Sequence, residues 1–198
     1  MRSFLFLATC AAATIASPAL ADVKPVGADG FVVRHEALVP VAADRAWHGL
    51  VQPARWWSGD HTFSGNAANL TLAPQAEGCF CETLPAGAAR MRAGSVRHMT
   101  VIFADPGKVL RLTGALGPLQ GEPVNAVLTV TLSGEGAGTR IVMEYVVGGA
   151  MRFSREQIGP AVDGVLREQL ARLAALFPVQ APAGDVGSDF LSGVGTRP

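Results

Sequence analysis

The strongest constraint on the fold is residues 158–177, near the end of the chain, where apolar residues recur at a helical period. The stripe consists of Ile158, Val162, Val165, Leu166, Leu170, Leu173 and Phe177, and Pro178 follows it. A helix with one apolar stripe must bury it against another element. Ser154 and Gln157 fit a capping box before it, and Pro160 favours a regular helix that begins near that residue. The rest of the chain must therefore supply an apolar surface for one long helix.

The middle of the chain predicts that surface as short strands separated by turn signals. We expect strands at 31–39, 69–72, 79–84, 96–103, 109–114, 125–132 and 139–147. Close turns between consecutive strands favour antiparallel pairing. Two short helices, at 42–51 and from Pro53 onward, follow the first strand. This order predicts an α+β fold: a curved antiparallel sheet of about seven strands wrapped around the long helix, with a cavity where sheet and helix splay apart.

The first residues resemble an export signal. Arg2 precedes an apolar run over 4–15, and Ala19-Leu20-Ala21 is an A-x-A cleavage pattern. Cleavage after Ala21 would give a periplasmic or secreted protein, while Cys10 leaves lipoprotein processing open as an alternative. We expect a signal peptide (1–21), a lead-in segment (22–30), one domain (31–178) and a disordered tail (179–198) rich in Gly, Pro, Ser and Asp.

The composition and charge of the chain argue against several classes of partner. Hydrophobic residues make up 49% of the chain and the formal charge is zero, so the sequence has a large core and no basic footprint for nucleic acid. No run approaches the roughly 20 apolar residues of a membrane span. No phosphate-binding G-x-x-x-x-G-K-[ST] loop is present. We expect no nucleic-acid partner, no membrane span, no cofactor and no metal, and the oligomeric state stays open.

Cys79 and Cys81 form a C-x-C pair. In a regular strand their Cα atoms lie roughly 6.5–7 Å apart, at the limit of disulfide geometry, so we expect two free thiols unless the backbone is kinked. A metal site with the scattered histidines is disfavoured, because C-x-C is not the usual zinc spacing.

Several short motifs resemble the SRPBCC superfamily (START-like or Bet v 1-like), and within it the polyketide cyclase/dehydrase and Hsp90-ATPase-activator-homologue groups. They lie at 39–43, 46–47, 55–58, 106–111 and 138–140, and the resemblance spans 31–177. It implies the helix-grip fold. Members bind lipids, sterols, polyketides or plant hormones, and only some are enzymes, so the fold alone leaves the function open. The export signal argues against an Hsp90-type partner.

Residues 55–65, RWWSGDHTFSG, place two tryptophans beside a polar loop, as at the rim of a pocket for a mostly apolar ligand. A Ser-His-Asp triad is disfavoured because no G-x-S-x-G elbow is present. Strand alternation leaves open whether His98 or Arg97 faces the cavity, and Arg111 has the same ambiguity. Glu82 and Glu144 are expected on the solvated face, with a buried general base as the alternative. The candidate ligand-binding residues are Trp56, Trp57, His61, His98, Arg111, Tyr145, Val162, Val165 and Leu166.

The sequence thus favours an exported protein that binds a hydrophobic small molecule such as a lipid, an isoprenoid or an aromatic polyketide. A cofactor-free cyclase or dehydratase that uses a pocket histidine or carboxylate is the alternative. A third possibility is an interaction protein whose own side chains fill the cavity.

Overall fold

The computed structural model describes residues 23–26, 30–87 and 91–178. The expected signal peptide and the expected tail lie outside these ranges. The strands are β1 (Val23–Val26), β2 (Gly30–Val39), β3 (Leu70–Leu72), β4 (Cys79–Leu84), β5 (Gly94–Asp105), β6 (Val109–Thr113), β7 (Val124–Glu135) and β8 (Gly138–Gly149). The helices are α1 (Ala43–Leu50) and α2 (Arg155–Ala174), and 3₁₀ turns lie at Pro53–Arg55, Gly59–His61, Ala67–Asn69 and Gly117–Gly121.

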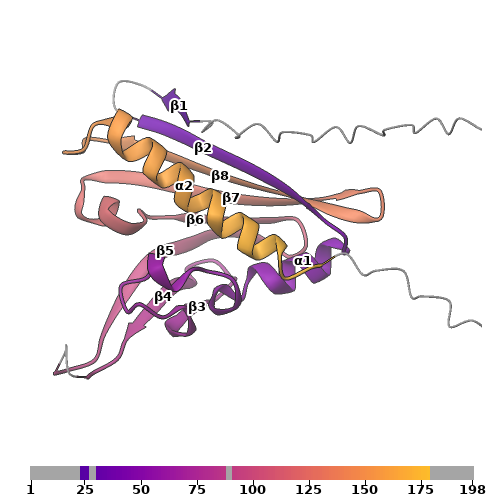
Figure 1. The fold of residues 1–198 in the computed structure, drawn as a ribbon, viewed down its shortest axis with the longest axis horizontal. Coiled ribbons are helices and arrows are strands. Elements are labelled where there is room, and N and C mark those ends of the chain that lie inside the picture. Colours follow the sequence, from indigo (N-terminus) through magenta and orange to yellow (C-terminus); the bar gives the residue numbers. More distant parts are fainter. Residues whose placement is uncertain (1–22, 27–29, 88–90, 179–198) are drawn as a thin grey trace, which may run out of the picture.

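The strands form one antiparallel sheet in the order β1-β2-β8-β7-β6-β5-β4-β3. Strands β3 to β8 follow one another as a meander, and β2 joins its far edge by pairing with β8. The sheet is curved, and α2 lies across one face of it (Figure 1). These features confirm the expected α+β helix-grip fold.

Alternating residues of the strands face α2 and form the core. On β8 the inward residues Ile141, Met143, Tyr145 and Val147 are buried, while their neighbours are partly exposed. On α2 the buried apolar residues include Leu166, Leu170 and Leu173. Apolar burial of this kind contributes roughly 25 cal/mol per Å², which explains why the helical stripe and the strand alternation select this arrangement.

Two details differ from the prediction. The lead-in segment contains β1, which pairs with β2 from Val23↔Val33 to Val26↔Gly30, so the sheet has eight strands. Helix α2 begins at Arg155, and Pro160 lies inside it. The proline sits early in the helix, where its missing N–H removes one hydrogen bond, and the later turns compensate for this loss by packing. Ser154 is the N-cap residue, but its side chain makes no capping hydrogen bond.

The expectation of two free thiols is wrong, because Cys79 and Cys81 form a disulfide with their Cα atoms 5.3 Å apart. Their strand pairs with β5 through a register shift between Phe80 and Cys81. A β-bulge bends and twists the strands at such a shift. The two cysteines lie at this irregularity, and their Cα separation is shorter than the roughly 6.5–7 Å of a regular strand, which brings them within disulfide geometry.

Candidate functional site

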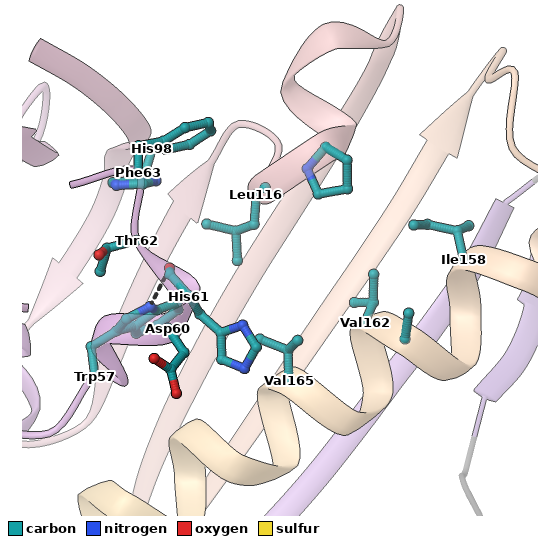
Figure 2. A pocket seen from close by; sticks show the side chains of 13 residues that line it. Trp57, Asp60, His61, Thr62, Phe63, His98, Leu116, Ile158, Val162 and Val165 are labelled. Atoms are coloured by element: carbon teal, nitrogen blue, oxygen red, sulfur yellow. Dashed lines mark hydrogen bonds between the residues drawn. The ribbon is translucent and has the colours of Figure 1, made fainter. Parts of the chain in front are cut away.

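A cavity of about 430 Å³ lies between the first half of α2 and the loops that cover the open end of the sheet. Figure 2 shows the α2 side chains Ile158, Val162 and Val165 on one side and Phe63 and His98 on the other. Its lining is almost entirely apolar. The lining residues are Trp57, Asp60, His61, Thr62, Phe63, His98, Leu116, Gly117, Pro118, Ile158, Ala161, Val162 and Val165.

The tryptophan pair and the loop after it form one rim of the cavity. Both rings are buried. The indole Nε1 of Trp57 donates to the carbonyl of His61 at 3.0 Å, which fixes the polar loop on the ring (Figure 2). The His61 imidazole lies 3.1 Å from Glu168 on α2, so the loop is also tied to the helix. Both contacts hold the rim over the cavity.

The buried wall of the cavity contains a histidine–carboxylate pair. His98 Nε2 lies 2.9 Å from Glu82 Oε2, and both side chains are at most 6% exposed. The amides of Phe63 and Ser64 donate to the two oxygens of Glu82 at 3.0 and 2.5 Å. The carboxylate therefore anchors the rim loop and the histidine together.

The protonation states of the pair follow from these contacts. Burial raises the pKa of Glu82, but hydrogen bonds from Ser64, from the Phe63 amide and from His98 outweigh it, so the pKa lies below its usual value. Burial lowers the pKa of His98, and Glu82 opposes this shift only in part. At neutral pH Glu82 is thus ionised and His98 neutral. An ionised carboxylate only accepts hydrogen bonds, so Nε2 must carry the imidazole proton.

The position of His98 depends on a β-bulge that strand alternation does not predict. Phe80 pairs with Met99 and Cys81 with Arg97, which leaves His98 as the extra residue of β5. His98 and Met99 are consequently both buried, and Arg97 is exposed. The ring of His98 lies between Phe63 and Phe80, with centroids 5.9 and 5.0 Å away. On the same inner face Glu82 is buried, so its expected place on the solvated face is wrong.

Tyr145 fixes a second part of the rim. It points inward as expected, is fully buried, and its hydroxyl accepts a hydrogen bond from the amide of Leu116 at 3.0 Å. Burial raises the pKa of Tyr145 to about 12. Tyr145 does not line the cavity itself. It positions Leu116, which lines the cavity.

The other candidates lie elsewhere. Leu166 is buried in the core and does not line the cavity. Trp56 borders a separate void of about 30 Å³, and its Nε1 donates to the carbonyl of Leu50. Arg111 lies on the outer face of β6, where its Nε donates to Thr129 and its guanidinium lies over the Phe103 ring. The structure therefore does not bring Trp56, Arg111 or Leu166 to the cavity, whereas Trp57, His61, His98, Val162 and Val165 line it.

Two features near the site, a polar groove and a histidine–aspartate pair, were not expected from the sequence. His98 also borders an open, polar groove of about 430 Å³ formed where β6 ends, with Arg97, Gln120 and Asn125 among its walls. Deeper in the interface of α2 and β2, His35 Nε2 lies 3.0 Å from the buried Asp163. The sequence contains no local signal for either arrangement, since each joins residues far apart in the chain.

Within the described residues, no group of three or more His, Cys, Asp and Glu side chains is arranged to hold a metal ion. No helix among those residues is long and apolar enough to cross a membrane.

No family model and no curated protein matches this sequence. Solved structures do resemble it. A protein from Rhizobium leguminosarum, 15% identical, has a TM-score of 0.55 and covers 75% of this chain and 95% of its own. Protein MLL2253 from Mesorhizobium loti, 20% identical, has a TM-score of 0.50 with 73% and 95% coverage. Ara h 8.0201, 9% identical, has a TM-score of 0.51 with 75% and 97% coverage. At these identities the likeness shows a shared fold and nothing finer.

Proposed function

We propose that this helix-grip protein is an exported protein that binds one hydrophobic small molecule in the cavity between α2 and the loops. The observation that carries the proposal is the cavity itself, about 430 Å³ with an almost wholly apolar lining. Ligand pockets usually measure about 300–1,000 Å³ and combine apolar walls with a few polar groups. The resemblance of residues 1–21 to an export signal supports a role outside the cytoplasm.

The rim supports binding rather than a filled interior. Phe63 is 52% exposed and presents a large apolar surface, and the buried ring of Trp57 lines the same cavity. Asp60 and His61 stand at the open side, where solvent reaches them. An apolar molecule would cover this aromatic surface and gain roughly 25 cal/mol per Å² buried.

A second candidate is a cofactor-free enzyme of the cyclase or dehydratase type, favoured by the Glu82–His98 pair. A neutral histidine held by a carboxylate can accept a proton from a bound substrate. The cavity wall provides no second buried polar group beside the pair among the described lining residues, so stabilisation of a developing oxyanion has no evident source. Ligand binding is therefore the better supported function.

A fluorescence titration tests the proposal. N-phenyl-1-naphthylamine is a neutral apolar probe whose emission rises in an apolar site. We expect saturable 1:1 binding with a micromolar dissociation constant, equivalent to about 8 kcal/mol. Emission that rises linearly without saturation, or that needs several probes per chain, would contradict a single defined cavity.

A further inference from the structure

His98 is the buried polar residue among those that line the cavity, and its chemistry indicates what the ligand carries. We propose that His98 Nδ1 accepts a hydrogen bond from a hydroxyl group of the bound molecule. The ligand is then an apolar alcohol or phenol whose polar end lies against the Glu82–His98 pair. This inference rests on the proposed function and specifies its ligand class.

The Glu82 contact determines which nitrogen of His98 is available. Nε2 lies 2.9 Å from Glu82, and the carboxylate fixes the proton on Nε2. Nδ1 then keeps a lone pair, and no described residue donates a hydrogen bond to it. Phe63 and Phe80 pack against the ring, and a flip of the ring would break the contact between Nε2 and Glu82. His98 lines the cavity, and Nδ1 is the ring nitrogen that is left as an acceptor.

The other polar groups at the cavity do not provide a matching buried site. The indole N–H of Trp57 and the hydroxyl of Thr62 donate to the backbone carbonyls of His61 and Gly59. Asp60 and His61 lie at the exposed side. The buried wall therefore provides an acceptor and no free donor, so it suits a hydroxyl and disfavours a carboxylate, which would place its own lone pairs against Nδ1.

Energetics make this selectivity measurable. A hydroxyl buried without a partner costs about 1–3 kcal/mol, so a purely apolar cavity would prefer a methyl group at the same position. An acceptor at Nδ1 removes that penalty. 2-Naphthol and 2-methylnaphthalene have nearly the same shape and differ only in a hydroxyl or a methyl substituent. The ratio of their affinities therefore reports whether that substituent meets a hydrogen-bond acceptor or an apolar wall.

The test measures both compounds by displacement of N-phenyl-1-naphthylamine. In the wild-type protein 2-naphthol binds at least as tightly as 2-methylnaphthalene. In His98→Phe, which keeps an aromatic ring beside Phe63 and Phe80, the preference shifts towards 2-methylnaphthalene by about tenfold, equivalent to about 1.4 kcal/mol, because the hydrogen bond to the hydroxyl is lost. His48→Phe is the matched control: it changes an exposed histidine of α1 that does not line the cavity, and it leaves the ratio of the two affinities unaltered.

A ¹⁵N NMR measurement on the wild-type protein keeps the test independent of the variant's folding. The unprotonated Nδ1 resonance of His98 moves upfield with 2-naphthol and stays in place with 2-methylnaphthalene. A wild-type preference for 2-methylnaphthalene, or a ratio that is the same in His98→Phe and in the His48→Phe control, would overturn the proposal. If neither compound nor the probe binds, the proposed function itself fails, which is a distinct outcome.

Discussion

Glu82→Leu destabilises the folded protein by several kcal/mol. The carboxylate accepts hydrogen bonds from the Phe63 amide, the Ser64 amide and His98, and leucine accepts none. A buried donor left unpaired costs about 1–3 kcal/mol, and the two amides are only partly buried, so the expected loss is on the order of 3–6 kcal/mol. The total free energy of unfolding of a small domain is only about 5–15 kcal/mol. Urea unfolding at pH 7 measures the difference.

Glu144→Leu is the matched control, because Glu144 is also a strand carboxylate but lies on the outer face of β8. Its effect should stay within about 0.5 kcal/mol, as for most surface substitutions. Equal effects in the two variants would contradict a structural role for the Glu82 cluster.

Acid pH should reduce the difference between Glu82→Leu and the wild type. The folded pKa of Glu82 lies below the unfolded value of 4.5, so its contribution is present above pH 4.5 and is lost as the pH falls through the folded pKa. The folded pKa of His98 also lies below its unfolded value of 6.5, so its burial weakens the wild type as the pH falls below 6.5. Urea unfolding repeated between pH 7 and pH 3 follows both effects.

Val162→Trp abolishes most binding in the cavity. Val162 projects from α2 into the cavity (Figure 2), and an indole there occupies space that the ligand needs. We expect the dissociation constant of N-phenyl-1-naphthylamine to rise at least tenfold, a loss of about 1.4 kcal/mol or more. Stability changes little, because the ring enters existing space rather than a packed core.

The control for this variant is Ala171→Trp, which adds the same ring to an exposed position of α2 away from the cavity. It should bind the probe as the wild type does. A Val162→Trp protein that keeps wild-type affinity would place the probe outside the cavity.

The fold could be predicted because its determinants are periodic. The apolar stripe of α2 repeats at the helical period and β8 alternates strictly, so local patterns report directly on burial. The inward direction of Tyr145 followed from the same alternation. The lead-in strand β1 was missed because VKPV is short and contains a proline, which suits only an edge strand.

The site could be predicted only in part. Trp57 and His61 were recognisable because both belong to one continuous segment, 55–65, that forms the rim. Within it the Trp57 indole donates to the His61 carbonyl. The Glu82–His98 pair was not, because a bulge inserts His98 into β5 and shifts the face on which the following residues lie. Cys79 and Cys81 lie at the same irregularity, and their disulfide was not expected from the spacing of a regular strand. A one-residue irregularity of this kind leaves no mark in composition or hydrophobic period.

Native mass spectrometry of the protein, purified without detergent, tests the central claim most directly. We expect the wild type to carry one small-molecule adduct, on the order of a few hundred daltons for a cavity of this size, and Val162→Trp to lack it. Incubation with N-phenyl-1-naphthylamine should replace the adduct by one probe per chain in the wild type alone. A wild-type protein that carries neither adduct nor probe, or a variant that carries as much as the wild type, would contradict binding in this cavity.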